Sequence, residues 1–165
     1  MKTLLIVRHA KSSWDSDAST DAERPLNARG KQDAPMMAKR LLEKKITIDR
    51  FVSSPAKRAK RTAQYFLEEY EGKDKQLIIY KDLYEASVKD FYKVVSEQKD
   101  GDDCIAIFSH NPGITEFANI LTEVKIDNMP TCSVFAVTVK IESWKEFETT
   151  SKSFLFFDYP KNVQK

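Results

Sequence analysis

The sequence predicts a three-layer α/β/α sandwich, in which helices cover both faces of a mostly parallel central sheet. Short apolar segments typical of buried strands alternate with longer segments whose apolar residues recur at helical spacing. The last third of the chain contains two strand-like segments in succession, which predict an antiparallel hairpin at the C-terminal edge of the sheet. The chain has 165 residues without an internal repeat or a linker, so we expect residues 1–165 to form a single domain.

The first half of the chain contains three predicted strands and a long loop. Apolar residues at 4–7 and 51–53 are typical of short buried strands, and a third such strand is expected at 77–80. Residues 12–27 are polar and lack periodicity, so they predict an ordered loop. A loop of this length in a compact domain is usually functional. Apolar residues at helical spacing predict a helix over about 30–45.

A second helix is expected to run from Pro55 to about Tyr70. Ser54 is a favourable N-cap residue, and proline is common at the first position of a helix. The sequence therefore predicts that this helix begins directly after the strand at 51–53, with Ser54 as its cap.

The second half of the chain contains a predicted helix, a strand, a further helix and the two hairpin strands. Their expected bounds are 91–96, 104–108, 112–121, 133–141 and 146–157. The turn of the hairpin is expected near Ser143.

Composition narrows the classes of function. Hydrophobic residues make up 41% and charged residues 32% of the chain, as in a soluble globular protein. The net charge of +2 gives no general reason to expect nucleic acid or membrane as a partner. The first apolar run stops at Arg8, too early for a signal peptide, and Cys104 and Cys132 are expected to be reduced core thiols. We therefore expect a cytoplasmic protein.

The two histidines of the chain each follow a predicted strand. His9 comes after the strand at 4–7, and His110 comes after the strand at 104–108. In open α/β sheets, ligands bind in the crevice outside the carboxyl ends of the strands. Both histidines are therefore predicted at the same edge of the sheet.

This edge is suited to holding a phosphate. Arg8 and Arg58 can each bind a phosphate with a planar fork of donors, and the helix N-termini favour an anion. One neutral imidazole can act as the nucleophile at phosphorus, and a second histidine, if protonated, can donate to an equatorial oxygen. Phosphoryl transfer needs mainly positioning and charge neutralisation, so we expect no metal and no cofactor.

Other interpretations of these residues remain open on spacing alone. A single histidine after a strand more often has a structural role. The basic run 57–61 could be a solvated helix face or a nucleic-acid patch, although it contains no aromatic residue for base stacking. Spacing does not separate Arg58 from Arg61, although Arg58 lies closer to the expected start of the helix.

Four motifs in order resemble those of the histidine phosphatase superfamily (phosphoglycerate mutase-like), and together they cover nearly the whole chain. They lie at residues 5–14, 24–30, 53–63 and 109–113. The segment Ala10-Lys11-Ser12 is similar to that of SixA-type phosphohistidine phosphatases, which carry Ala-Lys-Ser where mutases have glycine. The resemblance implies the phosphoglycerate mutase-like fold.

The resemblance also implies roles for individual residues. His9 corresponds to the phosphorylated nucleophile, and Arg8, Arg58 and His110 correspond to the rest of the phosphate pocket. The family pattern thus selects Arg58 over Arg61.

Three further residues are candidates for contact with the substrate. Arg24 lies where the family often has a basic substrate contact, although a salt bridge that anchors the loop is an alternative. Glu85 lies about where larger members place a general acid, but it could equally be a solvated carboxylate. Asn111 is expected to cap a helix or orient His110 rather than touch the substrate.

These observations predict a phosphatase that works through a phosphohistidine intermediate on His9. SixA-like members imply phosphohistidine in a protein as the substrate, with a histidine phosphotransfer domain as one partner. The short chain leaves few residues for a lid, so the site should be open, which suits a protein substrate. One alternative is a phosphatase of small phosphate esters that uses Glu85 as its general acid. Another is a non-catalytic phospho-ligand-binding module, which the presence of both histidines disfavours.

Overall fold

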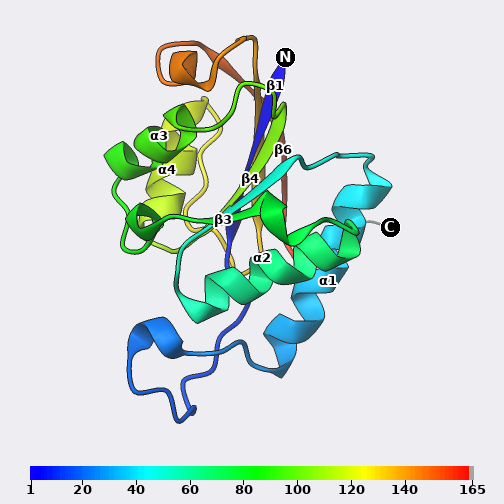
Figure 1. The fold of residues 1–165 in the computed structure, drawn as a ribbon. Coiled ribbons are helices and arrows are strands. Elements are labelled where there is room, and N and C mark those ends of the chain that lie inside the picture. The colour runs from blue at the N-terminus through cyan, green and yellow to red at the C-terminus, as the bar shows by residue number, and fades with distance from the viewer. Residues whose placement is uncertain (164–165) are drawn as a thin grey trace.

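A single six-stranded sheet forms the centre of the computed structural model, which describes residues 1–163 (Figure 1). The order of the strands across the sheet is β3-β2-β4-β1-β5-β6. The strands are β1 Lys2–Arg8, β2 Arg50–Ser53, β3 Leu77–Ile79, β4 Cys104–Ser109, β5 Val134–Val139 and β6 Lys152–Asp158.

The strand directions confirm the predicted fold class. Strands β3, β2, β4 and β1 pair in parallel, whereas β5 pairs antiparallel with both β1 and β6. The sheet is therefore mostly parallel, with an antiparallel hairpin at its C-terminal edge.

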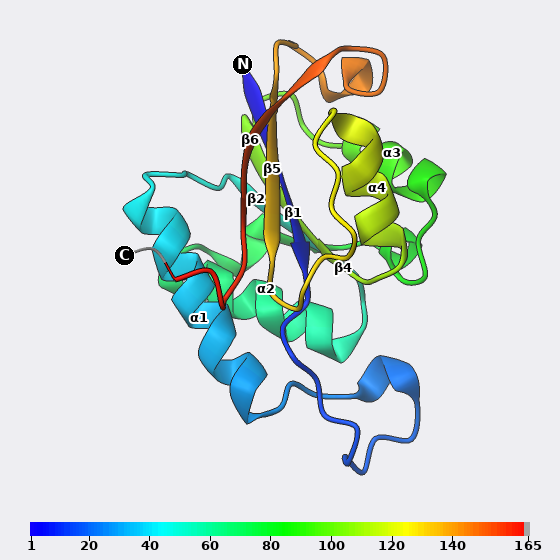
Figure 2. The same ribbon diagram turned by 180° about the vertical axis from the view of Figure 1, so that it is seen from behind.

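Helices cover both faces of this sheet. They are α1 Ala28–Glu43, α2 Lys57–Glu69, α3 Val88–Ser96 and α4 Gly113–Leu121. Figures 1 and 2 show α1 and α2 together on one face and α3 and α4 on the other. The three layers follow the alternation of strands and helices in the sequence.

The period of two along each strand divides the core between the two faces. In β1, Leu4 and Ile6 pack in the core under α3 and α4, whereas Leu5 and Val7 pack in the core under α1 and α2. All four side chains are fully buried. Burial on both faces explains why this strand is a continuous apolar run rather than an alternating one.

The second hairpin strand was predicted to begin at residue 146, but the strand β6 begins at Lys152. The connection contains a short 3-10 helix at Trp144–Glu146, which Ser143 and Glu146 cap reciprocally through their side chains. Trp144 is fully buried, and its Nε1 donates to the carbonyl of Asp102 at 2.8 Å. Packing of this indole against the core therefore lengthens the turn that was expected near Ser143.

The N-cap predicted for the second helix was also wrong. The helix α2 begins at Lys57, and its N-cap residue is Ala56, which makes no side-chain capping bond. The hydroxyl of Ser54 accepts a hydrogen bond from the Ala56 amide at 3.1 Å, so it stabilises the turn that precedes the helix.

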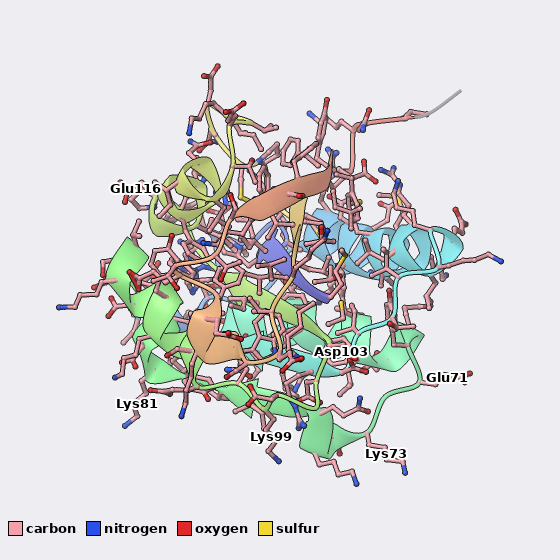
Figure 3. The ribbon with its side chains drawn as sticks, turned by 90° about the horizontal axis from the view of Figure 1, so that it is seen from above. Glu71, Lys73, Lys81, Lys99, Asp103 and Glu116 are labelled. Carbon is pink, nitrogen blue, oxygen red and sulfur yellow. The ribbon has the colours of Figure 1, made fainter. Side chains whose placement is uncertain are left out.

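The two ends of the parallel strands differ in their surroundings. The turn before β4 carries Lys99 and Asp103 at the amino ends of the strands, the end that faces the viewer in Figure 3. The opposite, carboxyl ends face the loop 10–27, which lies beneath the sheet in Figure 1.

Within residues 1–163, none of the helices has the length and the hydrophobicity that a membrane-spanning helix requires.

Candidate active site

The two histidines lie side by side at the carboxyl ends of neighbouring strands. Strands β1 and β4 are in parallel register with Arg8 opposite Ser109, so the next residue of each strand enters the same crevice. The ring centroids of His9 and His110 are 5.1 Å apart, with an interplanar angle of 51°. Both imidazoles are buried.

The ring of His9 is held by a backbone carbonyl. Its Nδ1 lies 2.7 Å from the carbonyl oxygen of Ala10, so Nδ1 carries the proton and donates to this acceptor. The other ring nitrogen, Nε2, lies 3.4 Å from Nε of Arg58, which donates to it. Burial lowers the pKa of His9 to about 3, against the opposing effect of the Ala10 carbonyl, with smaller contributions from His110 and Arg58. His9 is therefore neutral at physiological pH and has a lone pair on Nε2, as a nucleophile requires.

Arg58 points into the crevice from the first turn of α2. Its Nη1 donates to the backbone carbonyl of Asp21 at 2.8 Å, and its Nη2 donates to the carboxylate of Asp21 at 2.9 Å. Arg61 instead lies on the outer side of α2, where it pairs with Glu68 at 3.1 Å and stacks on Tyr65. Of the two arginines that spacing left undecided, Arg58 is the one at the site.

Arg8 contributes a second guanidinium. Its Nη1 donates to the carbonyl of Met129 at 2.8 Å, whereas its buried Nε has no partner within the described residues. Burial and the neighbouring Arg58 lower the pKa of Arg8. A buried donor without a partner, next to a second guanidinium, is suited to binding an anion.

His110 is held by a serine that the sequence suggested only as a cap. Its Nε2 lies 2.7 Å from Oγ of Ser54, and its buried Nδ1 has no partner among residues 1–163. Burial, followed by the charge of Arg58, lowers the pKa of His110 to about 4. His110 is therefore neutral at pH 7, so the protonation that donation to a phosphate oxygen requires is not met in this structure.

Asp21 is the residue at this site that sequence reasoning missed. Its carboxylate accepts hydrogen bonds from Arg58, from Arg24 at 3.1 Å and from the hydroxyl of Tyr84 at 2.6 Å. The bond from Tyr84, followed by the pair with Arg58, holds the pKa of Asp21 below its usual value. Its one signal in the sequence was its position in the long polar loop, three residues before Arg24.

Arg24 anchors the loop as well as lining the site. Its Nε donates to the carbonyl of Ser13 at 3.2 Å, and its Nη2 donates to the hydroxyl of Ser12. Its guanidinium also stacks over the ring of Trp14 at 3.5 Å from the centroid. These contacts fit the loop-anchoring alternative, and they give Ser12 a partner that the sequence did not suggest.

Asn111 connects the site to a neighbouring loop. Its Nδ2 donates to Oδ1 of Asn128 at 2.8 Å and to the carbonyl of Met129 at 3.2 Å, and its Oδ1 accepts from Thr115 at 2.6 Å. The same Met129 carbonyl accepts from Arg8. Asn111 therefore positions the loop that holds Arg8, and the expectation that it caps the helix or orients His110 was wrong, because its side chain makes these bonds instead.

Most of the predicted site residues line one cavity, which has a volume of about 240 Å³. It is lined by Arg8, His9, Lys11, Ser12, Trp14, Asp21, Arg24, Arg58, His110, Asn111 and Thr131. Glu85 does not line this cavity. It lines an adjoining hollow of about 440 Å³ together with Tyr84, His110 and Glu116.

Removing the charge of Asp21 should tighten anion binding. The carboxylate faces Arg58 where a dianionic phosphate would bind, so its charge opposes the ligand. We expect Asp21→Asn to lower the inhibition constant of inorganic phosphate by roughly threefold to tenfold. Asp17→Asn is the matched control, because Asp17 is an exposed carboxylate of the same loop. Weaker phosphate inhibition of Asp21→Asn would instead mean that Asp21 mainly orients Arg58.

The two buried imidazoles should make stability depend on pH. An unfolded histidine takes up a proton near pH 6.5, whereas His9 and His110 in the folded protein do so only near 3 and 4. Between these values the unfolded state binds more protons, so the free energy of unfolding falls as pH falls below 6.5. Urea titrations at pH 7 and 5 should differ by up to about 2 kcal/mol for each histidine. His9→Asn should show a smaller difference, and an equal difference would contradict this assignment.

Comparisons with known proteins agree with this geometry. A family model described as the histidine phosphatase superfamily (branch 1) matches residues 4–98. A chloroplast protein of Arabidopsis thaliana is 26% identical over 153 residues, which cover 88% of this chain and 70% of that protein.

Two solved structures share the fold. The protein histidine phosphatase SixA, complexed with tungstate, superposes with a TM-score of 0.82 at 22% identity and covers 98% of this chain and 99% of its own. A mycobacterial glucosyl-3-phosphoglycerate phosphatase superposes with a TM-score of 0.67 at 13% identity, covering 94% of this chain and 97% of its own. The family match extends over more than half of the 165 residues. The chain therefore belongs to the histidine phosphatase superfamily and is a phosphatase enzyme.

Proposed function

We propose that this enzyme removes a phosphoryl group from phosphohistidine in a protein, through a phosphohistidine intermediate on His9. The observation that carries the proposal is the unprotonated Nε2 of His9 beside Arg58, in a cavity that Arg8 and His110 also line. A nucleophile among anion-binding groups is the arrangement that phosphoryl transfer needs.

In the first step, Nε2 of His9 attacks phosphorus in line with the leaving group. The new N–P bond forms as the bond from phosphorus to the leaving group breaks, and the leaving group keeps the bonding electron pair. Arg58 and Arg8 donate to the equatorial oxygens. The hydrogen bond from Nδ1 to the Ala10 carbonyl stabilises the positive charge that develops on the ring of His9.

The dianion also changes the state of His110. A bound phosphate favours the protonated imidazole and raises its pKa from the low value that burial and Arg58 produce. The unpartnered Nδ1 then donates to the phosphoryl group, while Nε2 donates to Ser54.

In the second step, water attacks the phosphorylated His9. The O–P bond forms as the N–P bond breaks, the electron pair returns to Nε2, and a proton of the water passes to solvent. The products are inorganic phosphate and the neutral His9 from which the cycle began.

Three observations support phosphohistidine in a protein as the substrate. The cavity of about 240 Å³ is open at the surface, so a phosphoryl group on a protein side chain can enter it. Phosphorylated imidazole is also a good leaving group, so it needs less help from a general acid than an alkoxide does. SixA, with the same fold, is a protein histidine phosphatase, and a histidine phosphotransfer domain is one candidate partner.

The two buried free thiols support the cytoplasm as the compartment.

An activity panel tests the proposed substrate class. It compares a phosphohistidine protein, a phosphohistidine peptide and small phosphate esters, with His9→Ala as the control. We expect the phosphohistidine substrates to have the highest kcat/KM. A higher kcat/KM for a small phosphate ester would contradict this proposal and support the alternative described next.

The alternative is a phosphatase of small esters that uses Glu85 as general acid. Glu85 and His110 line one hollow, which adjoins the site, and a mycobacterial glucosyl-3-phosphoglycerate phosphatase shares the fold. In this case Glu85→Gln should slow ester hydrolysis by roughly 10²-fold and remove the basic limb of the pH profile.

Glu116→Gln is the matched control for this variant, because Glu116 lines the same hollow from α4, where Figure 3 labels it. If Glu85→Gln and Glu116→Gln both keep wild-type activity on the ester, Glu85 is not a general acid, and this result would support phosphohistidine as the substrate.

A further inference from the structure

A second groove opens next to the catalytic cavity. It has a volume of about 580 Å³ and shares two lining residues, Lys11 and Thr131, with the cavity that contains His9. The groove is lined by Lys11, Asn27, Arg29, Asp33, Pro130, Thr131, Tyr159, Pro160 and Lys161. A ligand that extends from the phosphoryl group over Lys11 therefore enters it directly.

Segments far apart in the sequence build this groove. The chain after β6 passes beside α1, as Figure 2 shows, where Arg40 of α1 donates to the carbonyls of Tyr159 and Pro160 at 2.9 and 2.8 Å. These bonds fix the position of the segment that carries Lys161. The groove is thus a formed part of the fold.

The charge of the groove is positive. Its three cations are Lys11, Arg29 and Lys161, and its one carboxylate, Asp33, is buried and already paired with Arg29 at 3.4 Å. Lys11 and Lys161 are exposed and form no ion pair with another residue in 1–163. Two cations on the rim are therefore available to a ligand.

The other side of the catalytic cavity has the opposite charge. The hollow that adjoins it there is lined by the carboxylates of Asp21, Glu85 and Glu116 and by the guanidinium of Arg58. A chain that crosses the catalytic cavity thus meets cations on one side and carboxylates on the other. Such a surface favours one direction of a bound segment.

We propose that this groove binds an acidic segment next to the phosphorylated residue of the substrate protein. The proposal rests on the proposed function, because it assumes a protein substrate. The carboxylates of the segment pair with Lys11 and Lys161, and its apolar atoms pack against Pro130, Tyr159 and Pro160. These cations and apolar residues together form the proposed binding surface.

Binding of matched peptides tests the groove without requiring turnover. Two fluorescent peptides carry a non-hydrolysable phosphonate analogue of phosphohistidine, one with three adjacent aspartates and one with asparagines in their place. We expect a Kd about tenfold lower for the aspartate peptide, from a few exposed ion pairs. Salt at about 0.5 M should reduce this ratio, because it screens exposed charges.

Two charge-reversal variants, Lys161→Glu and Lys99→Glu, test whether the difference in Kd between the peptides arises in the groove. Both replace an exposed lysine by the same acid, but Lys99 lies at the opposite end of the strands (Figure 3). Lys161→Glu should reduce the ratio to about twofold or less, and Lys99→Glu should keep it near the wild-type value. Equal Kd values for the two peptides, or an unchanged ratio in Lys161→Glu, would overturn the proposal.

Hydrolysis of the corresponding phosphohistidine peptides separates the two proposals. If both peptides are hydrolysed but bind with equal Kd, the phosphatase function stands and the groove does not bind acidic segments. If the aspartate peptide binds more tightly but neither is hydrolysed, the groove stands and the phosphohistidine function fails.

Discussion

His9→Ala should lower kcat/KM by at least a hundredfold while the protein remains folded. The variant lacks the unprotonated Nε2 that lies beside Arg58 in the cavity. Loss of a group that forms the bond to phosphorus removes roughly 3 kcal/mol or more of transition-state stabilisation. The removed ring interacts mainly with the Ala10 carbonyl, Arg58 and His110, so circular dichroism should be unchanged.

Chemical trapping adds a readout that loss of activity alone does not provide. Wild-type enzyme quenched during turnover of a ³²P-labelled substrate should carry an acid-labile, alkali-stable phosphoryl group. His9→Ala should carry none. A non-catalytic phospho-ligand-binding module would bind the ligand without forming this label. Normal turnover by His9→Ala would exclude the proposed mechanism.

The placement of the two histidines follows from local pattern. His9 and His110 each come directly after a strand that is apolar on both faces, and such strands lie in the middle of a parallel sheet. Parallel strands end at the same edge, so the pattern placed both rings at that edge, and the pairing of β1 with β4 makes them neighbours. The same logic applies to the strand β2, whose end leads into α2 and Arg58.

The parts that the sequence did not predict depend on contacts between distant residues. Asp21 reaches Arg58 and Tyr84 across 37 and 63 positions, and nothing near Asp21 in the sequence reports those partners. The neutral state of His110 likewise results from burial and from Arg58, which are properties of the assembled site. The second hairpin strand begins later than predicted because the connection before it packs the indole of Trp144 into the core. Local periodicity contains none of this information.

Arg58→Lys should reduce kcat/KM by at least a hundredfold, even though it conserves the charge. The guanidinium holds Asp21 with two nitrogens and approaches His9 with the third, and a lysine ammonium cannot make these contacts in one plane. Loss of one preorganised donor to a developing anionic charge typically costs about 10²- to 10³-fold in rate. Because Arg58 is buried, solvent cannot replace the missing donor.

Arg61→Lys is the matched control for this prediction, since it makes the same substitution one turn along α2. Arg61 pairs with Glu68 on the outer side of the helix, so its replacement should change kcat/KM by less than about twofold. The contrast between the two variants tests whether the guanidinium beside His9, rather than positive charge on α2, drives the reaction. If Arg58→Lys keeps wild-type kcat/KM, or Arg61→Lys loses as much, then the phosphoryl group does not bind where Arg58 meets His9.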